Sequence, residues 1–339
     1  MKRGILLLVL LLAARVAAAA PAPNVANTSQ WGSLLIFPDI VMRANATTII
    51  RLSNGGPSGV DVRCEYLDRN GNKNGINVST MTLPPRSPVS FDMSQDPYFL
   101  TGGNRGALFC WAVSGDDQVK WNYLGGTATV FNTVNMNSYE YNAWSFAVRA
   151  AGADGAKIGT PGQIKLNGQQ YDACPQYLVG QFSPAGTQAF TPGHTVRFYD
   201  NAVAVASCSV DLTAPHLPVG GGPYVTTLRL KTWNDAGGQA GPTTNECIDE
   251  WDVTTLPDRT LPASKNSEYY RIQGVSSTSC SGSQAVGLVG VQSSNIDLLG
   301  PLTCQPPCVI DPWVGTTLNG ENSAKGCIIW QSGVDWCYP

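Results

Sequence analysis

The chain has 339 residues, a formal net charge of −3, and only 13% charged residues, about half the usual share. Lys and Arg are not clustered as phosphate neutralisation requires, so we expect no nucleic-acid partner. Gly, Ser, Thr and Asn replace the missing charges, which is typical of extracellular β-rich proteins and unlike helical cytosolic enzymes.

Residues 1–20 predict a secretory signal peptide. A basic start precedes an apolar run at 5–12, which is too short to anchor stably in a bilayer, and small residues at 17–20 form a cleavage zone. No later window holds eighteen apolar residues, so we expect no membrane span after cleavage. The mature chain is then secreted, periplasmic or held at the cell surface. Its polar start, 21–30, is expected to be mobile or, alternatively, to act as a strand donor.

The rest of the chain predicts an all-β protein. Short runs rich in Val, Ile, Thr, Tyr and Phe alternate with turn clusters. No window of twelve or more residues shows a 3.6-residue period, and the 23 Pro would interrupt most helices. The expected strands include, in chain order, 33–38, 47–53, 60–67, 76–83, 107–113, 127–131, 143–150, 194–199, 203–210, 224–233, 269–275, 285–291 and 326–330.

The stretch YLDRNGNKNG at 66–75 places a side-chain oxygen at every second position, as a calcium loop does. An EF-hand loop starting at Asp68 would need Gly where Lys73 stands and Glu where Ser79 stands. The Asn-Gly pairs favour a tight hairpin instead. We therefore predict a solvated turn, and no metal.

An even number of Cys in an exported chain predicts a disulfide framework. There is no C-x-x-C motif, and there are only two His, so zinc and haem sites lack their signatures. We expect neither metal nor cofactor. Order along the chain suggests pairs 64–110, 174–208 and 247–280, with the last four pairing among themselves. The ten are Cys64, Cys110, Cys174, Cys208, Cys247, Cys280, Cys304, Cys308, Cys327 and Cys337.

A weak internal repeat suggests a duplication. TTIIRLSN at 47–54 is similar to TTLRLKTWN at 226–234, and three further pairs keep the same order, although shared composition is an alternative explanation. The pattern resembles secreted immunoglobulin-like sandwiches. The predicted fold is two immunoglobulin-like or Greek-key β-sandwich domains stapled by disulfides. The predicted divisions are a first sandwich at 28–150, a connecting β segment at 151–199, a second sandwich at 200–303 and a Cys-rich tail at 304–339.

The densest acidic cluster is ECIDEWD at 246–252. In a single strand, Glu246, Glu250 and Asp252 would share one face, while Asp249 and Trp251 would share the other. Such a row could bind a sugar or a cation, or could be a solvated edge that discourages strand pairing. We take these five residues as the candidate ligand-binding site.

Aromatic residues also gather at 121–126, 140–144 and 311–313. They could stack against carbohydrate, although packing in a sandwich core explains them equally well.

No catalytic residues are predicted. Each of the two His follows a turn residue, and no G-x-S-x-G motif occurs. We expect a non-enzymatic exported protein that acts as a cell-surface, adhesive or extracellular structural component, with an unknown protein or carbohydrate partner or with self-assembly. The alternatives are an accessory carbohydrate-binding protein and a secreted hydrolase whose site is assembled from distant residues. A binding protein should show exposed Trp or Tyr in a cleft, whereas a hydrolase should show buried carboxylates or a His beside a nucleophile.

Overall fold

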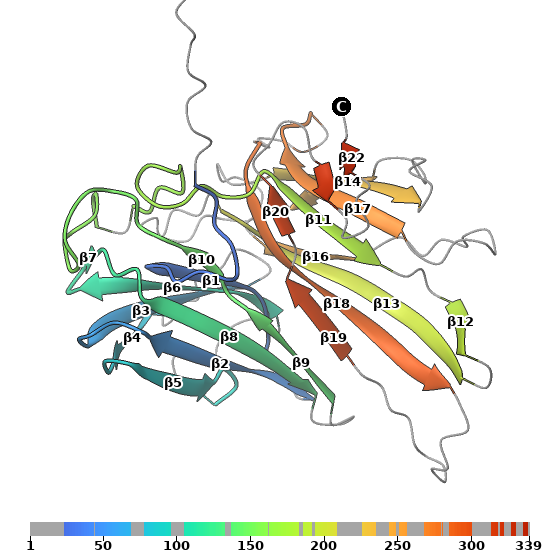
Figure 1. Cartoon of the computed structure of the whole chain (residues 1–339), viewed down its shortest axis with the longest axis horizontal. Helices are drawn as coiled ribbons and strands as arrows, with labels where there is room; N and C mark the ends of the chain where they lie inside the picture. Colours follow the sequence, from blue (N-terminus) through green and yellow to red (C-terminus); the bar gives the residue numbers. More distant parts are fainter. Residues whose placement is uncertain are drawn as a thin grey trace, which may run out of the picture.

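Figure 1 shows the computed structural model of the chain, in which the regular elements are β-strands. The structure describes residues 24–43, 45–68, 78–95, 105–132, 137–161, 163–182, 186–191, 194–208, 226–234, 244–248, 251–255, 268–278, 280, 285–299, 313–317, 319–321, 327–329 and 335–337. These ranges contain no helix, and so none that is long and apolar enough to traverse a membrane. The all-β prediction is confirmed.

Two antiparallel sheets form a sandwich in the N-terminal half. The first sheet has the order β10-β1-β6-β3-β4, with β7 paired to β6, and the second has the order β5-β2-β8-β9. The strands of the first are β1 (Leu34–Val41), β3 (Val60–Asp68), β4 (Val78–Leu83), β6 (Arg105–Ser114), β7 (Asp117–Gln118) and β10 (Trp144–Phe146). Those of the second are β2 (Ala46–Asn54), β5 (Ser87–Asp92), β8 (Leu124–Asn132) and β9 (Asn137–Asn142).

The C-terminal half forms two further sheets and a small hairpin, with strand orders β12-β13-β18-β19 (β16 on β13), β15-β14-β17-β11-β20 and β21-β22. The first contains β12 (Gly186–Thr191), β13 (His194–Ser207), β16 (Trp251–Thr255), β18 (Leu288–Leu299) and β19 (Trp313–Thr317). The second contains β11 (Tyr177–Phe182), β14 (Thr226–Asn234), β15 (Thr244–Ile248), β17 (Glu268–Val275) and β20 (Asn319–Glu321). The hairpin is β21 (Cys327–Ile329) with β22 (Asp335–Cys337).

The sheet containing β1 is covered on both faces. Every residue of β1 is buried, because alternate side chains enter two different cores. Leu35 and Phe37 pack toward the sheet of β2 and β8. Leu34 and Ile36 pack with residues of the C-terminal half, where β1 contacts β13 and β18. Figure 1 shows the two halves side by side, with β1 to β10 in blue to green and β13 and β18 in yellow and orange. The predicted division at 28–150 and 200–303 stays a prediction, and the described residues place a common core between these parts.

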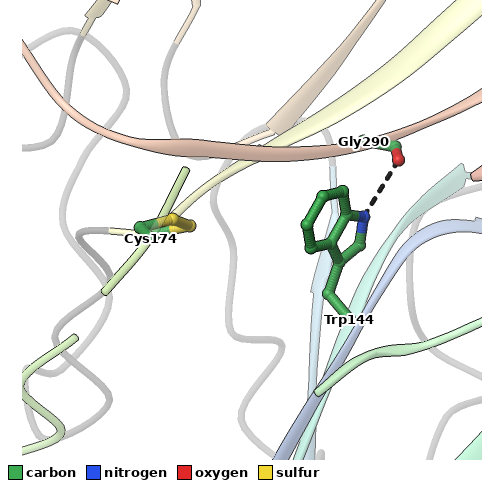
Figure 2. The surroundings of a disulfide bond; sticks show 4 residues. Trp144, Cys174 and Gly290 are labelled. Atoms are coloured by element: carbon green, nitrogen blue, oxygen red, sulfur yellow. Dashed lines mark hydrogen bonds between the residues drawn. A yellow bond between two sulfur atoms is a disulfide. The ribbon is translucent and has the colours of Figure 1, made fainter. Parts of the chain in front are cut away.

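Two tryptophans also bond across this junction. The indole nitrogen of Trp144, in β10, donates to the carbonyl of Gly290 at 3.0 Å, as Figure 2 shows. In the opposite direction, Trp251 in β16 donates to the carbonyl of Pro38 at 2.6 Å. Pro38 lies at a register shift of β1 between Phe37 and Ile40, which leaves its carbonyl outside the regular ladder with β6.

Three predicted disulfides are confirmed: Cys64–Cys110, Cys174–Cys208 and Cys247–Cys280. Their sequence separations of 46, 34 and 33 residues give each about 4 kcal/mol in the chain-entropy account. Cys64 and Cys110 lie opposite each other on the neighbouring strands β3 and β6, whereas antibody domains join two sheets.

The pairing of the last four Cys stays a prediction. Cys327 and Cys337 lie opposite each other across β21 and β22, while Cys304 and Cys308 lie outside the described residues. The turn predicted after β3 is also mainly outside them, at 69–77, although β3 and β4 pair antiparallel as a hairpin requires.

Candidate functional site

The segment before β1 is fixed against the sandwich by backbone hydrogen bonds. Ala26 donates to the carbonyl of Ala173, and Ser145 donates to that of Asn27, both at 2.9 Å. Gly32 and Leu124 exchange two further bonds of 2.9 Å. We expected 21–30 to be mobile or a strand donor. Residues 21–23 lie outside the described residues, but Asn24, Ala26 and Asn27 bond to this chain's own backbone, which holds the nearby Trp31 in place.

The side chain of Trp31 lies against the backbone of two glycines, and half of the surface of Trp31 is exposed. A Cβ added to Gly55 would come within 3.2 to 3.4 Å of three atoms of its six-membered ring, and a Cβ added to Gly125 within 3.0 Å. Similar distances to several ring atoms indicate that the ring lies flat on the glycines. Trp31 as a residue is 50% exposed, and since one face of its ring meets the glycines, we infer that the opposite face is available to a ligand.

A cleft of about 300 Å³ opens beside this ring. Residues 28–31 form one wall. The floor is the outer face of β2 and β8, and the other lining residues lie where β9 ends and β10 begins, next to residues 27–30. Its polar side chains are those of Thr28, Ser29, Gln30, Arg51, Ser53, Thr127, Asn142 and Ser145. The volume is at the lower end of small-molecule sites, suited to one or two compact rings.

The floor is organised by strand register. Arg51 pairs with Thr127, and Thr127 pairs with Asn142, so three polar residues form one row across β2, β8 and β9. The next row on this face lies two residues farther along the strands, at a distance of about 7 Å. In this row Ser53 pairs with Gly125, on which Trp31 lies. The alternation of β2 explains the exposure of the row, because Ile50 and Leu52 on either side of Arg51 are buried.

Gln30 anchors the wall of the cleft to a buried carboxylate. Its amide nitrogen donates to the carbonyl of Ser145 at 2.8 Å and to Asp172 at 2.7 Å. Asp172 has no exposed surface, and it also accepts from Arg149 at 2.5 Å and from the backbone of Ala147 at 2.9 Å. Since a buried charge must be paired and hydrogen-bonded, this network fixes 28–31 relative to β10.

A second buried carboxylate, Asp39, lies at the bulge of β1. Arg105 donates to both of its oxygens, at 2.7 and 2.8 Å, and Tyr139 donates at 2.5 Å. Burial lowers the pKa of Arg105, but the charge of Asp39 outweighs it and raises the pKa overall. Burial and the same charge raise the pKa of Tyr139. This cluster secures the bulge whose Pro38 carbonyl receives Trp251, so we assign it a structural role.

The predicted site at 246–252 is divided between two sheets, which corrects the expectation of a single strand. Glu246 belongs to β15, which pairs with β14, whereas Trp251 and Asp252 belong to β16, which pairs with β13. Asp249 and Glu250 lie outside the described residues. Trp251 is 2% exposed and bonded to Pro38, so it packs in the core. A ligand-binding role for the acidic residues stays a prediction.

The aromatic clusters at 121–126 and 140–144 consist mostly of core residues, whereas the side chains of the cluster at 311–313 lie outside the described part of the chain. Trp121, Tyr141 and Trp144 are buried. The same stretches nevertheless contribute Gly125 and Asn142 to the cleft. Trp31 itself was missed, and its only local signal is its position beside Gly32, just before a predicted strand.

No protein-family model and no curated protein sequence matches this chain. Among solved structures, it is similar to a calcium-binding mutant of Bacteroides uniformis beta-glucuronidase 2, with 9% identity and a TM-score of 0.16. That match covers 91% of this chain but 29% of the glucuronidase chain. The major pilin from Streptococcus pyogenes matches at 12% identity and a TM-score of 0.19, covering 84% of this chain and 97% of the pilin. Such low TM-scores carry no functional argument.

Proposed function

We propose that this protein is an exported, non-enzymatic surface protein that adheres to carbohydrate through the Trp31 cleft. The observation that carries this proposal is the ring of Trp31, backed by Gly55 and Gly125 and open on its other face. A pyranose has C–H groups on its faces and hydroxyls around its rim. An aromatic face next to hydrogen-bonding side chains complements both features.

Binding agrees with the cleft better than hydrolysis does. Glycoside hydrolysis requires two carboxylates on either side of the scissile bond, and the described lining of the cleft contains none. The buried carboxylates of Asp39 and Asp172 each face an arginine, Arg105 and Arg149, and hold structural segments in place. The three disulfides are compatible with an oxidising, extracellular location.

The test is a glycan array probed with the wild-type protein and with Trp31→Ala. We expect wild-type binding to a subset of glycans, and a loss of about five- to 150-fold in the variant, since stacking contacts contribute about 1 to 3 kcal/mol. Trp31→Phe keeps a smaller ring and should retain part of the affinity. The thermal midpoint should hardly change, because the side chain is half exposed. Equal binding by wild type and Trp31→Ala would refute the proposal.

A further inference from the structure

The lining of the cleft carries one charged side chain, that of Arg51. It projects from the exposed face of β2, between buried neighbours on the same strand. In the part of the chain that the structure describes, it takes part in no hydrogen bond and no ion pair. A guanidinium offers five N–H donors in a planar fork that fits a carboxylate with two parallel hydrogen bonds.

The nearest acidic residues on this sheet face lie one row farther from Trp31. Asp92 pairs with Ile49 across β5 and β2, and Glu140 pairs with Thr129 across β9 and β8. Asp92 accepts bonds from Thr47 and from Ser94, and Glu140 accepts one from Thr129. These carboxylates are therefore engaged outside the cleft, and Arg51 supplies the charge among the described residues that line it.

We propose that the cleft is selective for acidic saccharides, whose carboxylate pairs with Arg51 while a sugar ring stacks on Trp31. The proposal rests on the carbohydrate-binding function given above. The row of Arg51 is about 7 Å from the row beneath Trp31. A ring on the indole therefore brings its own substituent, or the neighbouring residue of the glycan, next to the guanidinium. Thr127 and Asn142 in the same row are placed to bond adjacent hydroxyls.

The experiment uses pairs of glycans that differ only in charge: oligogalacturonate, oligoglucuronate and 3′-sialyllactose, each beside its methyl ester. Affinities are measured by titration calorimetry at low and high salt. We expect wild type to bind at least one acid about tenfold more tightly than its ester, as charge-assisted hydrogen bonds of this kind provide. The difference should shrink at high salt, since the site is open to solvent.

Arg51→Gln should lose the preference for the acid while keeping the affinity for the ester. Lys157→Gln is the matched control, because it removes the same charge from an exposed side chain outside the cleft. Trp31→Ala should lose both ligands. If Arg51→Gln retains the preference, or wild type binds acid and ester equally, the acidic selectivity is wrong and the carbohydrate site stands. If no pair binds, the acidic selectivity is wrong and the carbohydrate function rests on the array; if Trp31→Ala binds a glycan like wild type, both proposals are wrong.

Discussion

Replacing Trp144 by Phe should weaken the junction between the two halves of the chain by about 2.5 kcal/mol. The side chain is 1% exposed, and its indole nitrogen bonds to Gly290. Phe removes that hydrogen bond, which is worth about 1 kcal/mol. It also removes two ring carbons, each comparable to a buried methylene at about 0.8 kcal/mol. Trp31→Phe is the matched control; it makes the same substitution at a half-exposed site and should cost less than about 0.5 kcal/mol.

The assay is urea unfolding of the oxidised protein, followed by tryptophan fluorescence and far-UV circular dichroism. Because β1 and β6 contribute to cores with both halves, wild type should unfold in one transition by both probes. Trp144→Phe should move the midpoint without splitting the transition. A loss no larger than that of Trp31→Phe would refute the reasoning on the junction. Two separate wild-type transitions would refute the common core.

Three further predictions concern single sites. Gly125→Ala should reduce glycan binding by about tenfold, because its Cβ would meet the ring of Trp31 at 3.0 Å. Gly59→Ala is the control: its Cβ would lie 3.4 Å from the carbonyl oxygen of Leu83, an ordinary contact, so this variant should bind like wild type in the same array. Asp39→Asn should lower the free energy of unfolding by about 3 kcal/mol, since it breaks the buried ion pair with Arg105. In a double-mutant cycle measured by denaturation, Asp39→Asn combined with Arg105→Gln should lose less stability than the sum of the two single variants. Tyr171→Phe should raise the free energy of unfolding by about 1 kcal/mol, because the buried hydroxyl has no hydrogen-bond partner among the described residues; a loss of stability would contradict this. Burial raises the pKa of Tyr171 in the folded state, so wild type should lose stability as the pH rises above 10.0, and the phenylalanine variant should lose less in pH-dependent melts.

Local pattern was enough to predict most of the strands, whereas the first three disulfides were predicted from the order of the cysteines along the chain. A period of two marks a strand such as β2 wherever one face is solvated. The pattern of β1 is different, because a strand buried on both faces does not alternate between apolar and polar residues. Its sequence therefore does not indicate which elements cover each face. At 246–252, two short strands in different sheets read as one strand, because pairing partners are not encoded in the period.

The cleft could not be predicted, because its parts come from distant segments. Trp31 is exposed only because Gly55 and Gly125, each at the end of a different strand, let the ring lie flat. A Trp is highly buried on average, and Trp111, Trp144 and Trp251 are core residues of this kind. The exception depends on strand register, which becomes visible only in three dimensions.

The doubly covered sheet also has a consequence for biosynthesis. One face of β6 carries Ala107, Phe109, Trp111 and Val113, and the residues of β13, β16 and β18 that belong to the same core are synthesised only later. Until those strands have been synthesised, the nascent chain exposes an apolar surface that can aggregate or bind a chaperone. A fragment that stops before β13 should therefore be insoluble, even though it contains both sheets of the first sandwich.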